Sequence, residues 1–167
     1  LVNSAEVRFD FTHFSALTAE ELCAVEKEVN ANILAALPVK VREMSIEDAK
    51  ERGAMALFGE KYGEVVRVVA AGKVSMELCG GTHVEDASHI GLFKILSESS
   101  VAAGVRRTTA VTGLGVLATL EDYKKLALDV AGELKTANIH ELPAKVAQLS
   151  GELKEKDRKI ATLEARV

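Results

Sequence analysis

A thiol and an imidazole stand four residues apart in the segment 76–84, MELCGGTHV, with two glycines between them. A cysteine thiolate and a neutral histidine ring are typical zinc donors, and Gly80 and Gly81 would let the backbone wrap around an ion. The segment therefore predicts that Cys79 and His83 are metal ligands. The same spacing also fits a glycine turn after a strand, with Cys79 packed as a small apolar residue and His83 capping backbone groups.

Two donors do not complete a zinc site, because catalytic zinc usually has three protein ligands and structural zinc four. The other candidate donors are His13, His89, His140 and Cys23, and they form no second paired motif. Each fits a simpler role: His13 stacks at a strand end, His89 lies in a polar turn, His140 breaks a helix, and Cys23 belongs to an amphipathic helix. His89 is the nearest of the histidines to Cys79.

Two adjacent arginines, Arg106 and Arg107, occur in the segment GVRRTTAVTG. Successive residues of a strand point to opposite faces, so at most one of them faces a pocket. The alternative is an edge strand that carries one solvated arginine. The glycines nearby match no phosphate-binding loop, and the sequence contains neither a Walker lysine motif nor GxGxxG, so ATP binding within this segment is not indicated.

Composition bounds the class of protein. Of the 167 residues, 48% are hydrophobic and 28% are charged, which is typical of a globular domain with room for an appendage. The net charge of −4 gives no overall attraction to nucleic acid, so an RNA contact would need a local basic patch. The two cysteines favour a reducing cytoplasm, no apolar run predicts a membrane span, and the absence of an initiator methionine suggests a fragment.

Both strands and helices are predicted to position these residues. Alternating patterns predict strands over 7–11, 39–44, 65–70, 74–78, 91–96 and 105–111, with a connection over 97–104. A capping box at Thr18 and Glu21 opens a helix that runs toward Pro38, and Ser45 caps a short helix ending near Gly53. Without regular βαβ alternation, the pattern predicts an α+β domain, a mostly antiparallel sheet covered by helices.

The last third of the sequence is helical. A helix runs from Leu114 to about Lys135, a break follows at 138–140, and Pro143 starts a second helix. Its apolar residues recur at spacings of four and three, which predicts an antiparallel helical, coiled-coil arm; they are Leu142, Val146, Leu149, Leu153, Ile160, Leu163 and Val167. We therefore expect a domain over 1–113 and an arm over 114–167 that stops in mid-pattern.

The segment MELCGGTHV, taken with GLFKILSESSVAAGVRRTTAVTG, resembles the editing domain of alanyl-tRNA synthetase. The segments VRFDFTHF and VREMSIEDAKERGAMALFGEKYGEVVRVV and the helical arm follow the order of that family, so the resemblance covers essentially the whole chain. In that family a His-x-x-x-His motif and a Cys-x-x-x-His motif hold zinc together. The resemblance implies that Cys79 and His83 are half of such a site, and that the first motif precedes this segment.

The resemblance also implies a reaction. The whole enzyme joins alanine to its tRNA at the expense of ATP, and the editing domain hydrolyses the ester when serine or glycine has been attached instead. It implies that Thr82 lines the acyl pocket, that Arg106 or Arg107 lies near the acyl group or the RNA, and that the partner is the mischarged 3′ end of alanine tRNA. With two of four zinc ligands, the isolated chain is expected to be inactive.

Three other interpretations stay open at this point. Threonyl-tRNA synthetase carries a similar zinc-binding domain, and free-standing trans-editing deacylases share the Cys-x-x-x-His element. The coiled-coil arm favours the full synthetase over both. From another class, the chain could be an interaction module that self-associates through its arm, with CGGTH as a mere turn.

Overall fold

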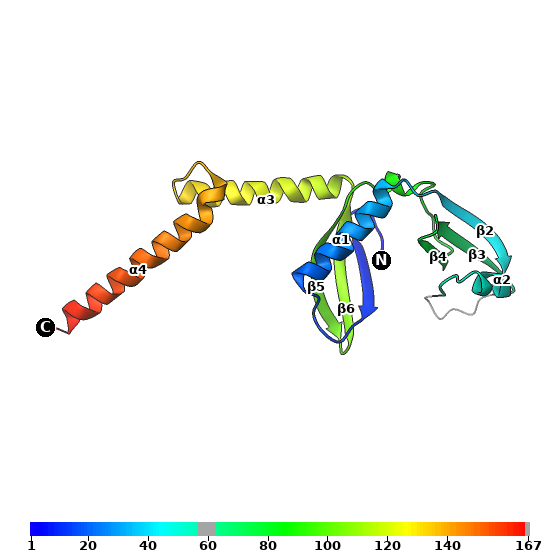
Figure 1. Ribbon diagram of the computed structural model, residues 1–167, viewed down its shortest axis with the longest axis horizontal. Coiled ribbons are helices and arrows are strands. Elements are labelled where there is room, and N and C mark those ends of the chain that lie inside the picture. The colour runs from blue at the N-terminus through cyan, green and yellow to red at the C-terminus, as the bar shows by residue number, and fades with distance from the viewer. Residues whose placement is uncertain (57–62, 166–167) are drawn as a thin grey trace. The chain divides into compact units, whose positions relative to one another are not determined.

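A computed structural model describes residues 1–56 and 63–165 (Figure 1). The chain divides into two compact units, Leu1–Leu117 and Ala118–Val167. The first contains all the described strands, arranged as two three-stranded antiparallel sheets with two α-helices, and the second is helical. The predicted α+β class is therefore confirmed, with two small sheets in place of one.

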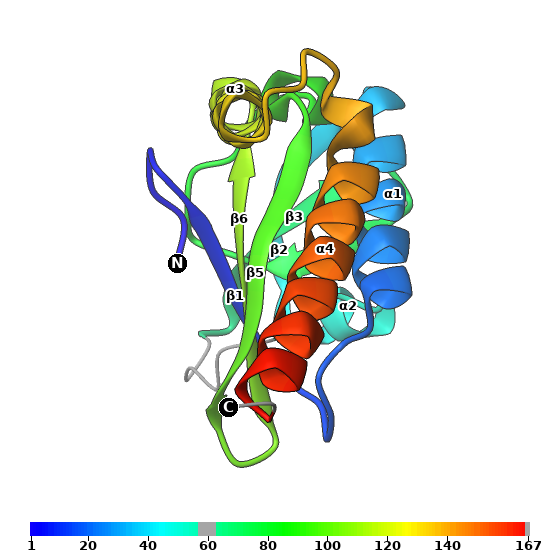
Figure 2. The same cartoon turned by 90° about the vertical axis from the view of Figure 1, so that its left-hand side faces the viewer.

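The first sheet has the order β1-β6-β5, built from β1 (Val7–Thr12), β6 (Val105–Thr112) and β5 (Phe93–Ala102) (Figure 2). The predicted connection over 97–104 is wrong, because β5 continues through it. Its polar second half pairs with β6 across two register shifts, and only a tight turn remains, with Gly104 at φ 68°. The second half of β5 is a strand because its polar residues pair with residues of β6. Hydrophobic alternation along one segment does not reveal pairs of this kind.

Helix α1 (Ala19–Leu34) begins at the predicted capping box, in which the Thr18 hydroxyl accepts from the Glu21 amide at 3.2 Å. The helix lies along the free edge of β5 (Figure 1). There Asn30 pairs with both the amide and the carbonyl of Phe93 at 2.8 Å, and Glu26 accepts from the Ile95 amide. Side chains of α1 thus satisfy edge groups that would otherwise invite another strand.

The second sheet has the order β2-β3-β4, built from β2 (Val39–Ser45), β3 (Val65–Ala71) and β4 (Ser75–Leu78). The predicted hairpin between β3 and β4 is confirmed, with Gly72 at φ 54° in its turn. Helix α2 (Ile46–Glu51) follows its predicted Ser45 cap and covers one face. The core there consists of Ala49, Val66, Val68 and Leu78. This packing anchors the end of β4, from which the Cys-x-x-x-His loop departs.

The helical part comprises α3 (Leu114–Glu133), a short 3-10 turn η2 (Ile139–Glu141) and α4 (Leu142–Glu164). The long last helix fits the predicted arm. No described residue of α4 is buried, however, and Leu149 and Leu153 are 47% and 62% exposed. The heptad pattern predicts that these two leucines pack against the first arm helix or against a symmetry-related chain. Within the described residues of this chain they stay largely exposed, and Val167 lies outside the described residues. Among the described residues, no helix has the length and apolarity needed to cross a membrane.

Candidate metal centre

The predicted pair meets at the end of the β3–β4 hairpin. Cys79 directly follows β4, and its amide donates to the Arg67 carbonyl at 3.2 Å, which extends the ladder by one residue. The loop then turns back, so that His83 Nε2 lies 3.2 Å from Cys79 Sγ. Beyond His83, the carbonyl of Glu85 accepts from the Val39 amide at 2.9 Å. Both ends of the loop are therefore held by the second sheet.

A third donor joins the pair. The carboxylate of Glu77 lies with Cys79 Sγ and a ring nitrogen of His83, all within 4.8 Å of one another. Glu77 precedes Cys79 by two residues, so the two side chains point to the same face of the strand. Sequence reasoning missed Glu77, although the predicted strand over 74–78 and its two-residue periodicity carried the signal.

The donor set fits zinc. A thiolate at about 2.3 Å and an imidazole nitrogen at about 2.0 Å on a tetrahedral ion lie roughly 3.5 Å apart, so the 3.2 Å between Sγ and Nε2 needs only a small opening. Carboxylate oxygen is the third ligand type that zinc accepts. Glu77 and Cys79 are half-buried and His83 is exposed, which leaves one side of the cluster open to a water or a substrate.

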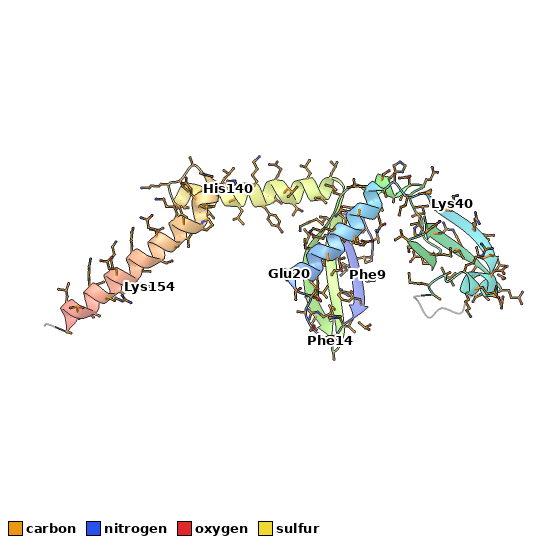
Figure 3. All side chains as sticks on the ribbon, viewed as in Figure 1. Phe9, Phe14, Glu20, Lys40, His140 and Lys154 are labelled. Carbon is orange, nitrogen blue, oxygen red and sulfur yellow. The ribbon has the colours of Figure 1, made fainter. Side chains whose placement is uncertain are left out.

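The other candidate donors do not belong to this cluster, which is the one group of this kind among the described residues. His13 bonds the Ser15 carbonyl at 2.9 Å and stacks on Phe14 with centroids 4.6 Å apart, so its predicted stacking is confirmed. His89 lies in the 3-10 helix η1 (Ala87–Ile90), and His140 lies in η2 before α4 (Figure 3). Cys23 is an exposed thiol on α1.

The predicted pocket residues lie apart in the fold. Thr82 is exposed within the Cys79–His83 loop, whereas Arg106 belongs to the first sheet. Arg106 forms a two-bond ion pair with Glu98, and Arg107 forms one with Asp10 on β1 at 2.7 Å. The edge-strand alternative is wrong, because β6 is the central strand of its sheet.

The Arg106–Glu98 pair is well covered, with side chains 15% and 6% exposed. Hydrogen bonds from the Arg106 side chain lower the pKa of Glu98 below its ordinary value of 4.5, and the charge of Arg106 adds to this. A carboxyl whose pKa is lower in the folded state binds fewer protons there than in the unfolded chain. Its contribution to stability is therefore complete above the ordinary value and is lost as the pH falls through the lowered one.

We accordingly expect Glu98→Gln to lower the melting temperature at neutral pH, because it breaks a charged pair in a covered position. The gap between wild type and variant should narrow as the pH falls below 4.5, since Glu98 is then protonated in the unfolded chain and, at lower pH, in the folded one. Thermal melts of both proteins across this range test the expectation. A gap that stays constant on acidification would contradict it.

Comparison with known proteins bears directly on this centre. Residues 66–108, which include Glu77, Cys79, His83 and Arg106, match the family model described as the threonyl and alanyl tRNA synthetase second additional domain. Over all 167 residues the chain is 50% identical to alanine–tRNA ligases of Exiguobacterium sibiricum, Alkaliphilus oremlandii and Bacillus subtilis. The chain is homologous throughout to part of alanine–tRNA ligase. The resemblance drawn from the motifs is thereby confirmed.

The match covers 100% of this chain and 19% of each of these alanine–tRNA ligases. The donor cluster, its glycine loop and the Arg106–Glu98 pair all lie inside the portion that matches the second additional domain. The arm lies outside that portion but inside the alanine–tRNA ligase match. The donor cluster and the arm therefore lie together within the match to alanine–tRNA ligase.

Proposed function

We propose that this segment serves the editing reaction of an alanine–tRNA ligase, an enzyme that joins alanine to its tRNA with ATP. In this proposal the segment hydrolyses the ester that links serine or glycine to alanine tRNA. The observation that carries it is the convergence of Glu77, Cys79 and His83 on an open face, within the part of the chain that matches the synthetase second additional domain. The partner is the mischarged 3′ end of the alanine tRNA.

There is a physical reason why such an enzyme needs editing. A synthetic site shaped for alanine cannot strongly reject glycine or serine, because a methyl-sized difference in a pocket is worth only about 1–3 kcal/mol. A second site that hydrolyses the wrong ester supplies the missing selectivity. An open, polar cluster on a tRNA synthetase segment is suited to that task.

In this proposal Glu77, Cys79 and His83 hold the metal. Zinc bound there would supply Lewis-acid chemistry to the ester carbonyl or to the water that attacks it. The exposed loop lets the acylated end of the tRNA approach. Thr82, placed between two of the donors, offers a hydroxyl that can bond the acyl group. A metal thiolate also suits a reducing compartment, which supports a cytoplasmic location.

Arg106 lies on β6 of the first sheet and is not part of the donor cluster. Its Nε and Nη2 donate to Glu98, which fixes the direction of the guanidinium. Among the described residues Nη1 has no hydrogen-bond acceptor, so it can serve a further one. We assign it the contact with the acyl group or the RNA, with the more exposed Arg107 as the second candidate.

The experiment that tests the proposed function is hydrolysis of alanine tRNA wrongly charged with serine, measured with an alanine–tRNA ligase that contains this segment. We expect faster release of serine than of correctly attached alanine. Release at the rate of the uncatalysed ester would contradict the proposal.

The exposed seam of α4 supports a second proposal, self-association through the arm. Val146, Leu149, Leu153, Ile160 and Leu163 recur at heptad spacing and are all exposed. An apolar stripe of this kind is an interaction surface. A free-standing deacylase would have no evident use for it, whereas an interaction module would.

We expect Leu149→Asp combined with Leu153→Asp to shift the chain from a self-associated form to a monomer, because two charges in an apolar seam are costly. Sedimentation equilibrium measures the mass of each form. The matched control is Ala147→Asp with Gln148→Asp, which adds the same charges away from the seam and should leave the mass unchanged. A monomeric wild type, or equal masses for both double variants, would contradict a functional seam.

A further inference from the structure

Arg67 on β3 is hydrogen-bonded to the Cys79–His83 loop. The hairpin pairs Val69 with Glu77 and Val68 with Leu78, so the next step places Arg67 opposite Cys79. Residues paired in this way share a face of the sheet, and alternation adds Glu77 to the same face. Arg67 therefore lies on the side of the sheet that carries two of the three donors.

The side chain of Arg67 bonds the backbone of the loop itself. Its Nη1 donates to the carbonyl of Cys79 and to the carbonyl of Gly81, each at 2.6 Å, and its own carbonyl accepts from the Cys79 amide at 3.2 Å. Three hydrogen bonds thus connect one residue of β3 to the first half of the segment that joins Cys79 to His83. Hydrogen bonds from a charged donor are the stronger ones.

The loop needs such a partner. Gly80 and Gly81 have no side chains to pack, and glycine leaves the backbone many conformations. A Cβ at Gly80 would contact nothing, and one at Gly81 would contact only Cys79 Sγ at 3.5 Å. The bonds from Arg67 therefore select one conformation of a segment that packing leaves free, the one in which His83 faces Cys79.

The chemistry of the arginine side chain suits this role. The guanidinium is charged at every accessible pH and has a fork that can serve several acceptors. Its hold on the two carbonyls also turns these oxygens toward Arg67, so they do not compete with the side-chain donors for an ion.

We propose that Arg67 is a positioning residue that fixes the Cys79–His83 loop for metal binding. The proposal rests on the metal site of the proposed function. It differs from a purely structural role in its consequence: loss of Arg67 weakens metal affinity while the sheet stays folded, because the core under β3 is made by Val66 and Val68 on the other face.

The experiment is a titration of the 167-residue chain with Co²⁺, a spectroscopic substitute for zinc, monitored by the absorption of the cobalt–thiolate bond. For Arg67→Gln we expect a loss of affinity of about 10–100-fold, the range typical of residues that orient metal ligands. For Arg67→Lys, which keeps the charge without the fork, we expect a smaller loss. The matched control is Arg42→Gln, an exposed arginine of β2 that pairs with Val68 and so belongs to the opposite face.

The outcomes separate the two proposals. If neither the wild-type chain nor an alanine–tRNA ligase that contains this segment gives a cobalt–thiolate band, the metal site is wrong. If the wild type binds and Arg67→Gln binds equally well, the role of Arg67 is wrong and the site stands. Should Arg67→Gln fail to fold, Arg67→Lys decides, since affinity equal to the wild type would overturn the proposal. As a second readout, alkylation of metal-free Arg67→Gln should be faster at Cys79 and unchanged at Cys23, and equal rates at Cys79 would count against it.

Discussion

Replacing Cys79 with serine in an alanine–tRNA ligase that contains this segment is expected to slow hydrolysis of serine from alanine tRNA by at least about 100-fold. A serine hydroxyl does not ionise as a thiol does on a metal, so the site loses an anionic donor. The metal's contribution to stabilising a hydrolytic transition state is several kcal/mol, and each 1.36 kcal/mol is about tenfold in rate. His83→Ala should have an effect of the same order.

Two controls make this result specific. Cys23→Ser changes an exposed thiol of α1 outside the cluster and should leave hydrolysis unchanged. Attachment of alanine should be unaffected in all three variants, because the segment contains no ATP-binding motif. If Cys79→Ser hydrolysed the wrong ester within a few-fold of the wild type, the donor cluster would have no part in editing.

Much of the fold could be predicted from local patterns. The alternation in β2, β3 and β4 and the caps at Thr18 and Ser45 are signals of one strand or one helical turn, and each is confirmed. The second half of β5 could not be predicted in this way. It is polar, and its strand conformation depends on pairing with β6 and on the Glu98–Arg106 pair, which are contacts between residues distant in sequence.

The site shows the same division. The spacing of Cys79 and His83 allows the two side chains to meet, because two glycines permit a tight loop, but the same spacing fits a simple glycine turn. The position of Glu77 follows from the two-residue periodicity of the strand, which places it on the same face as Cys79. Arg67 required the register of the hairpin, and its bonds to the Cys79 and Gly81 carbonyls depend on a side-chain direction that no local pattern specifies.

The arm marks another limit of pattern reasoning. A heptad stripe predicts that apolar side chains will be covered, but it does not say by which helix. In α4 the described residues of the stripe are exposed, so no helix within the described part of the chain covers them.

The measurement that tests the metal centre most directly is alkylation of the two cysteines of the chain with and without zinc. Coordination deprotonates and occupies a thiolate, so zinc should slow the reaction of Cys79 by at least about tenfold and a chelator should restore it. Cys23 is exposed, lies outside the cluster and serves as the internal standard. Glu77→Gln should need more zinc for the same protection, whereas Glu85→Gln, a loop acid outside the cluster, should behave as the wild type. Equal rates at Cys79 with saturating zinc and with chelator, both in the folded chain and in an alanine–tRNA ligase that contains this segment, would contradict the assignment of Glu77, Cys79 and His83 as a metal centre.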